Sequence, residues 1–85
     1  MTNQELAAAF DRIADLLEIK GEVIYKTIAY RRAAESLRGL SQEAAEIRAA
    51  GSLTDIPVVG KAIAEIMTEL LDTGRLEFLA RLEAE

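Results

Sequence analysis

Four glycines divide this chain into segments whose apolar residues recur at the spacing of an α-helix. In the first segment Leu6, Phe10 and Leu17 share one helical face, and Gly21 follows where that face ends. Glycine stops helices because it adopts the left-handed conformation that closes a last turn. The pattern therefore predicts an all-α chain of about four to five helices, packed as a small bundle around one core. The predicted helices run from the Thr2 cap to about Lys20, from Val23 to about Arg38, from Gln42 to about Ala50, from Lys61 to about Asp72 and from Arg75 to about Leu82.

Local signals place the helix ends and the buried faces. Thr2 and Glu5 have the spacing of a capping box, and Ser41 precedes the third helix as its cap. On the second helix the predicted buried stripe is Tyr25, Ala29, Ala33 and Leu37, with Tyr30 beside it. The neighbouring stripe is Ile24, Ile28, Arg31 and Glu35. That stripe either faces water or tucks its start beneath the first loop, and the sequence leaves both alternatives open.

The composition narrows the chemistry of an 85-residue chain, which is the length of one small domain. Without cysteine or histidine it offers no disulfide and no thiolate or imidazole ligand, so we expect no metal site and no cofactor. The net charge of −5 argues against strong nucleic-acid binding. No apolar run is long enough to span a membrane, and residues 1–5 do not begin a signal peptide. A chain without cysteine suits a reducing, cytoplasmic environment.

Residues 56–61 have the pattern of the turn in a helix-hairpin-helix, a motif that grips nucleic-acid backbones. Such a turn binds phosphate through backbone N–H groups at the start of its second helix. Gly60 and Lys61 keep part of that arrangement, because glycine allows close approach and lysine adds a charge-assisted contact. Val58 does not fit it, because a β-branched side chain resists a positive φ and holds a phosphate away.

Several stretches together carry a resemblance to a known family. They are residues 10–18 (FDRIADLLE), 29–34 (AYRRAA), 56–57 (IP), 59–65 (VGKAIAE) and 73–76 (TGRL). With them, nearly the whole chain resembles the N-terminal domain of family X DNA polymerases, of the bacterial and polymerase beta types. The resemblance implies a small helical bundle that binds the 5′-phosphate of gapped DNA. In some members it also implies removal of an abasic sugar phosphate through a lysine Schiff base.

The chain departs from that family where the family contacts DNA. The family's hairpin reads Pro-Gly-hydrophobic-Gly, and Val58 stands at the first glycine. Ile66 stands at the Schiff-base lysine, so this chemistry is absent at that position and we expect no enzyme activity. Bacterial members often have Asn-Pro-Phe where this chain has Val23-Ile24-Tyr25, and a basic residue shortly before Ala-Tyr-Arg, where it has Ile28.

These replacements predict a protein contact. By the resemblance they lie on neighbouring faces and make one apolar patch, and such a patch on a small domain usually marks an interface. We interpret the chain as a protein-binding module, with an engineered surface on a polymerase-domain scaffold. Its partner is a protein that the sequence does not identify, or a second copy of the chain. The predicted contact residues are Val23, Ile24, Thr27, Ile28, Val58, Ala62 and Ile66.

The alternative interpretation is a natural DNA-binding domain of a family X polymerase, which contacts the 5′-phosphate of gapped DNA. Its predicted contact residues are Lys26, Tyr30, Arg31, Val59, Gly60 and Lys61. On this interpretation DNA affinity falls steeply as salt rises. A third interpretation is a structural domain whose Val and Ile residues pack inside, so that it binds neither partner. Glu65 and Glu69 lie one turn apart, but such a pair on an exposed helix is more often a solvated face than a catalytic pair.

Overall fold

The computed structural model describes residues 1–21 and 24–84, and of Ile24 and Tyr25 it describes only the backbone. Within this part of the chain the protein is all-α, as the sequence predicts. Its elements are α1 (Asn3–Ile19), α2 (Ile24–Gly39), α3 (Ala44–Ala49), the 3-10 helix η1 (Leu53–Asp55), α4 (Lys61–Thr73) and α5 (Glu77–Ala84).

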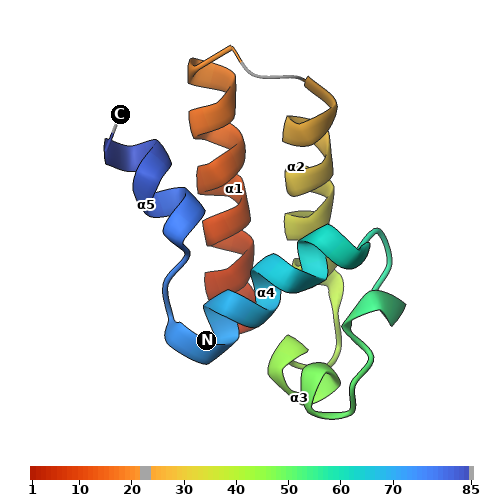
Figure 1. The fold of residues 1–85 in the computed structure, drawn as a ribbon. Coiled ribbons are helices and arrows are strands. Elements are labelled where there is room, and N and C mark those ends of the chain that lie inside the picture. The colour runs from red at the N-terminus through yellow and green to blue at the C-terminus, as the bar shows by residue number, and fades with distance from the viewer. Residues whose placement is uncertain (22–23, 85) are drawn as a thin grey trace.

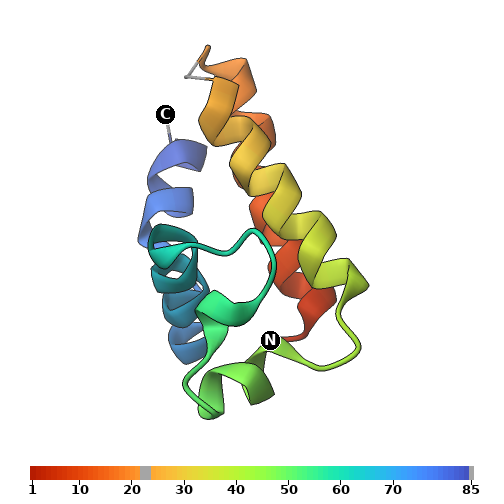
Figure 2. The same ribbon diagram turned by 90° about the vertical axis from the view of Figure 1, so that its right-hand side faces the viewer.

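The helices are arranged around α1. α1 and α2 run antiparallel and side by side, α4 crosses their lower half, and α5 returns along the other side of α1 (Figure 1). Seen from the side, α2 and the segment between η1 and α4 lie on the same flank of the molecule (Figure 2). The segment that leads into α4 is therefore held on the side of α2, and this arrangement positions the candidate site.

The structure confirms the cap, the stop and the buried face that the sequence predicts for α1. Thr2 accepts a hydrogen bond from the Glu5 backbone N–H at 3.1 Å, and the Glu5 carboxylate accepts one from the Thr2 backbone N–H at 2.8 Å. These bonds to Thr2 lower the pKa of Glu5. The helix ends before Gly21, whose φ of 73° gives the expected left-handed stop. Its predicted apolar face is buried in the core and comprises Leu6, Phe10, Ile13, Ala14 and Leu17.

α2 is rotated relative to the predicted stripe. Ala33 and Leu37 are fully buried as expected, but Ala34 and Thr27 are buried too, whereas Ala29 is exposed. The prediction for Ala29 was wrong because the face that meets α1 centres closer to Ala34, which turns Ala29 toward a cavity. The Tyr25 side chain lies outside the described residues.

α3 begins later than predicted, at Ala44, and the proposed Ser41 cap is wrong. The cap comes from another helix, α1, whose Asn3 side chain bonds the start of α3. Asn3 is only 6 % exposed. Asn3 Oδ1 accepts a hydrogen bond from the Ala44 backbone N–H, and Asn3 Nδ2 donates one to the Gln42 carbonyl, at 2.6 and 2.9 Å. A helix of six residues is too short to be stable alone, so this bridge fixes it against α1.

α4 and α5 are joined by a turn at Gly74, which has a φ of 70° and donates its N–H to the Leu70 carbonyl at 2.8 Å. The Glu69 carboxylate accepts a hydrogen bond from the Glu77 backbone N–H at 2.8 Å, so it caps α5. α5 therefore begins two residues after the predicted Arg75. Its Leu82 is buried, and Leu76 just before it is buried as well.

Candidate functional site

The hairpin between η1 and α4 is anchored by buried side chains. Leu53, Ile56 and Val59 are each less than 8 % exposed and belong to the core. The Val59 N–H donates to the Ile56 carbonyl at 3.1 Å and closes the turn. Ser36 of α2 donates its hydroxyl to the Pro57 carbonyl at 2.8 Å, which ties the hairpin to α2.

Val58, at the tip of this hairpin, has a positive φ of 61°. This left-handed conformation is unfavourable for a β-branched residue, because the side chain crowds the backbone. The Val58 side chain is also 56 % exposed, so no burial of apolar surface compensates fully for that cost. The turn thus keeps the backbone shape that a glycine would give it, and displays an apolar side chain at its tip.

The first turn of α4 offers unused backbone donors. Its N-cap, Gly60, makes no side-chain cap bond, and the first helical hydrogen bond runs from the Ala64 N–H to the Gly60 carbonyl at 2.9 Å. The N–H groups of Lys61 and Ala62 have no partner within the helix. Both residues are exposed, and an anion placed here would meet these N–H groups and the positive end of the helix dipole.

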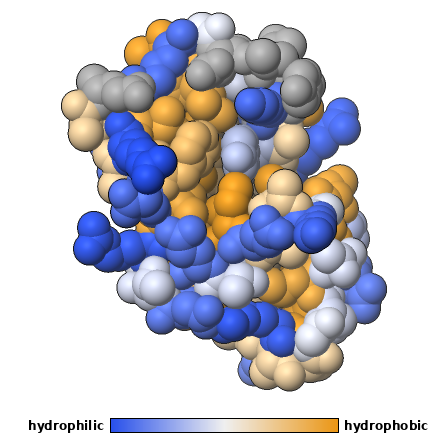
Figure 3. Space-filling model, in the orientation of Figure 1, coloured by the Kyte–Doolittle hydropathy of each residue, from blue (hydrophilic) through white to orange (hydrophobic). Residues whose placement is uncertain are grey.

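A cavity of about 320 Å³ opens beside this turn, between α1, α2, α4 and α5. Apolar side chains make most of the described wall, which also holds one ammonium group and one phenol. Figure 3 shows hydrophobic surface on this face above α4, with hydrophilic side chains around it. The residues that line the cavity are Leu17, Lys26, Ala29, Tyr30, Ala62, Ile63 and Phe78.

The sequence matches the family described as helix-hairpin-helix domain over residues 1–76. The chain belongs to the helix-hairpin-helix domain family. Helix-hairpin-helix domains generally bind nucleic acid. No curated protein matches the chain. The family match ends at Leu76, so α5, which supplies Phe78 to the cavity, lies outside it.

The contact residues predicted for a protein partner differ in their exposure in this helix-hairpin-helix domain. Ile28 is 43 % exposed and Val58 is exposed at the hairpin tip, while Ala62 lines the cavity. Ile66 is half-buried and packs against the core. Thr27 is only 3 % exposed, so its side chain is unable to belong to an exposed patch, contrary to the prediction. Val23 and the side chain of Ile24 lie outside the described residues.

The contact residues predicted for DNA include both exposed and buried positions. Lys26 and Lys61 are exposed, and Gly60 caps α4. Val59 is 5 % exposed and its N–H is already bonded within the turn, so its prediction as a DNA contact was wrong. Tyr30 is half-buried and its ring stacks on Phe10, with centroids 5.9 Å apart.

Arg31 and Tyr30 differ in how available they are to a phosphate. The Arg31 guanidinium donates to Asp15 and Glu18 of α1 at 2.9 and 3.0 Å, and these hydrogen bonds raise its pKa. Its charge is therefore already balanced within the domain. Burial raises the pKa of Tyr30, so its phenol stays protonated at neutral pH and is able to donate a hydrogen bond.

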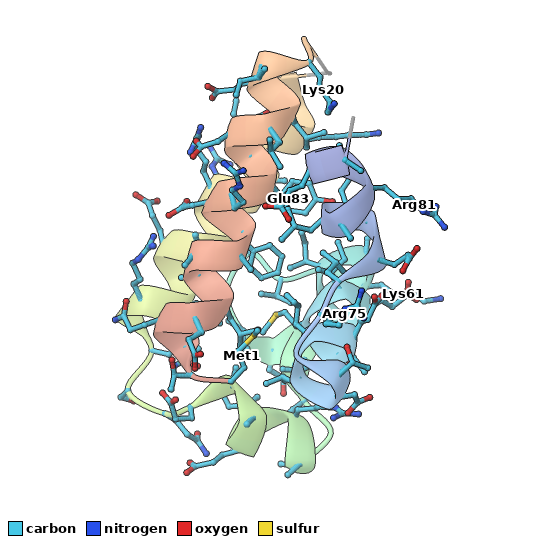
Figure 4. The ribbon with its side chains drawn as sticks, turned by 90° about the vertical axis from the view of Figure 1, so that its left-hand side faces the viewer. Met1, Lys20, Lys61, Arg75, Arg81 and Glu83 are labelled. Atoms are coloured by element: carbon cyan, nitrogen blue, oxygen red, sulfur yellow. The ribbon has the colours of Figure 1, made fainter. Side chains whose placement is uncertain are left out.

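Charge pairing separates the cations of this domain into two groups. Arg12, Arg31, Arg38, Arg48 and Arg81 each form an ion pair with a carboxylate. Figure 4 shows Glu83, the partner of Arg12, between α5 and α1, while Arg81 points outward. Lys26, Arg32, Lys61 and Arg75 make no ion pair with any residue in the described ranges. Unpaired cations thus occur on α2 and at both ends of α4, despite the net charge of −5.

Sequence reasoning missed four residues of the cavity. Leu17, Ala29 and Ile63 have the spacing of core positions, and nothing in the pattern set them apart from residues that are fully enclosed. Phe78 carried a signal that could have been used, since it falls off the Leu76, Leu79 and Leu82 stripe of the last helix. No group of three or more carboxylates in the described part of the chain could hold a metal ion. None of its helices is long and apolar enough to cross a membrane.

Proposed function

We propose that this helix-hairpin-helix domain recognises a protein, through an apolar contact centred on the hairpin tip. The observation that carries the proposal is Val58, an exposed β-branched residue held at a φ of 61°. An apolar side chain at this point occupies space that a phosphate needs, so it favours a dry contact with another apolar surface. Backbone strain of this kind persists where the side chain has a role.

A second exposed apolar residue, Ile28, lies on the helix that holds the hairpin and supports a protein contact there. Ile28 lies on α2, two helical turns before Ser36, which is bonded to the hairpin. At about 1.5 Å per residue the separation along the helix is roughly 12 Å, well within the footprint of one protein contact. Arg32, which is exposed and unpaired, lies between Ile28 and Ser36 and would add a polar rim.

The ancestry that accounts for these residues is the N-terminal domain of a family X DNA polymerase with a redesigned surface. Val58 in place of a glycine, Ile66 in place of the Schiff-base lysine and Ile28 in place of a basic residue each remove a feature used for DNA. Undirected change rarely concentrates apolar replacements at one functional surface, so we infer deliberate engineering. On this proposal the domain has no lyase activity, and the scaffold comes from a cytoplasmic enzyme.

Nucleic-acid binding remains the second candidate, because the uncapped start of α4 favours it. The exposed N–H groups of Lys61 and Ala62, together with the unpaired Lys61 ammonium, are donors that a phosphate could accept from. General nucleic-acid binding by helix-hairpin-helix domains supports this candidate as well. The exposed Val58 side chain and the pairing of Arg31 with two carboxylates oppose it.

Fluorescence anisotropy of a gapped DNA with a 5′-phosphate separates the two candidates. At physiological salt the protein-contact proposal predicts no binding tighter than about 0.1 mM, the weak end of non-specific DNA affinity. The double variant Val58→Gly and Ile66→Lys should then bind this DNA more tightly, with a steep salt dependence. Tight, salt-dependent binding by the unaltered protein would overturn the proposal in favour of nucleic acid.

A peptide library displayed on phage tests the protein contact directly. Peptides selected on the unaltered protein should carry apolar anchors, and their affinity should fall at least tenfold on Val58→Gly while changing little with salt. Arg75→Gln, which removes an unpaired cation from the α4–α5 turn, is the matched control and should have no effect. Selected peptides that bind Val58→Gly as well as the parent would show that the hairpin tip is not the contact.

A further inference from the structure

The cavity between α1, α2, α4 and α5 has features that the proposed hairpin contact does not use. Its volume of about 320 Å³ lies at the lower end of the range for small-molecule pockets. Leu17, Ile63 and Phe78 form an apolar wall, and Ala29 and Ala62 leave space because their side chains are short. Such a wall favours a hydrocarbon body and offers nothing to a sugar phosphate.

Among the described lining residues, both polar side chains come from α2. Lys26 and Tyr30 lie one helical turn apart, and both line the cavity. Lys26 is exposed and forms no ion pair with a described residue, so its ammonium is available to an incoming anion. The Tyr30 phenol is protonated and adds a hydrogen-bond donor. No aspartate or glutamate is among the described lining residues, so none of these side chains repels a negative charge.

We propose that this cavity binds a small organic acid, with its apolar body against Leu17, Ile63 and Phe78 and its carboxylate toward Lys26 and Tyr30. The ligand class follows from the combination of apolar lining, one free cation and one neutral donor. This site is separate from the hairpin tip and does not depend on a protein partner.

A matched series of three compounds on one skeleton tests the charge requirement. The probes are 3-phenylpropanoate, the neutral 3-phenylpropan-1-ol and the cationic 3-phenylpropan-1-amine, titrated into ¹⁵N-labelled protein and followed by NMR. For a ligand of this size we expect the acid to bind with a Kd on the order of 1 mM. The alcohol should bind at least about fivefold more weakly and the amine more weakly still, since a charge-assisted bond exceeds a neutral one. The largest shifts should fall on the amides of Ala29 and Ala62.

Two α2 variants separate the cavity from general charge attraction. Lys26→Gln should erase the preference for the acid over the alcohol while leaving the affinity of the alcohol unchanged. Arg32→Gln removes another unpaired cation of α2 that does not line the cavity, and it should leave the preference intact. Equal affinity of the three probes, or equal loss of the preference in both variants, would overturn the proposal.

A third variant checks that the apolar wall holds the body of the ligand. Ala62→Leu fills the cavity and should weaken the acid and the alcohol alike, with the amide pattern of α1 unchanged as proof of folding. Binding that survives this substitution undiminished would place the ligand elsewhere and refute the site.

Discussion

At the scale of a single residue, Val58 holds a backbone conformation that costs an L-amino acid about 1–2 kcal/mol. Val58→Gly should therefore raise the free energy of unfolding by about 1 kcal/mol, since the greater freedom of glycine in the unfolded chain offsets part of the relief. Urea denaturation measures this change in the free energy of unfolding. Val59→Gly is the matched control next door and should instead destabilise by several kcal/mol, because Val59 is buried. If the Val58→Gly protein were less stable than the parent, the backbone at Val58 would not be strained.

Thr27 has a buried hydroxyl that forms no hydrogen bond with any residue that the structure describes. Thr27→Val keeps the shape of the side chain and removes the unsatisfied group, so it should stabilise the protein by about 1 kcal/mol, or roughly 4–8 °C in Tm. Thr68 is the comparison, because its hydroxyl donates to the Ala64 carbonyl at 2.9 Å. Thr68→Val should bring no such gain, and equal effects in the two thermal melts would show that the Thr27 hydroxyl is satisfied in solution.

At the scale of the elements, α3 depends on a side chain from α1. Asn3→Ala removes the two side-chain hydrogen bonds that Asn3 makes to the α3 region and leaves the Ala44 N–H without its acceptor. It keeps the bond that the Asn3 backbone N–H donates to the Glu43 carboxylate at 3.3 Å. We expect a loss of about 1–3 kcal/mol in unfolding free energy, together with faster hydrogen exchange of the α3 amides. Gln4→Ala, at an exposed neighbouring position, should stay within about 0.5 kcal/mol. Unchanged exchange in α3 would mean that the helix is held by other contacts.

α1 and α3 show which helix ends can be predicted from a sequence. The start of α1 was predictable because its cap is local: Thr2 and Glu5 are three residues apart and bond each other. The start of α3 was not, because its cap residue is 41 positions away and belongs to a different helix. Ser41 has the residue type and position of a cap, but the Ala44 N–H at the start of α3 bonds Asn3 instead. Local chemistry thus predicts ends that are satisfied locally, and long-range packing decides the others.

At the scale of the whole molecule, the cavity could not be read from any one helix. Lys26, Ala62 and Phe78 come from three helices, and only their packing brings them to one wall. Sequence reasoning assigned Lys26 to DNA and Ala62 to a protein partner, since each was judged by the motif that contains it. Their common environment became visible only when the position of α5 against α1 was known.

That position of α5 leads to a test of the complete assembly. α5 packs on α1 through buried Leu82 and an ion pair between Arg12 and Glu83 at 3.2 Å. Leu82→Ala should lower the free energy of unfolding by about 2–3 kcal/mol, because it leaves a hole between the two helices. Arg81→Ala breaks only an exposed pair with Glu77 and should change it by less than about 0.5 kcal/mol.

Truncation after Leu76 extends this test to the cavity. The shortened chain keeps every residue of the family match but loses Phe78, so it should be less stable than Leu82→Ala and bind 3-phenylpropanoate more weakly than the parent. Thermal melts and NMR titration at a temperature where the truncated chain is folded measure the two effects separately. If the truncated protein kept both its stability and its affinity for the acid, α5 would be dispensable for the fold and for the cavity, and its docking on α1 would have no energetic role.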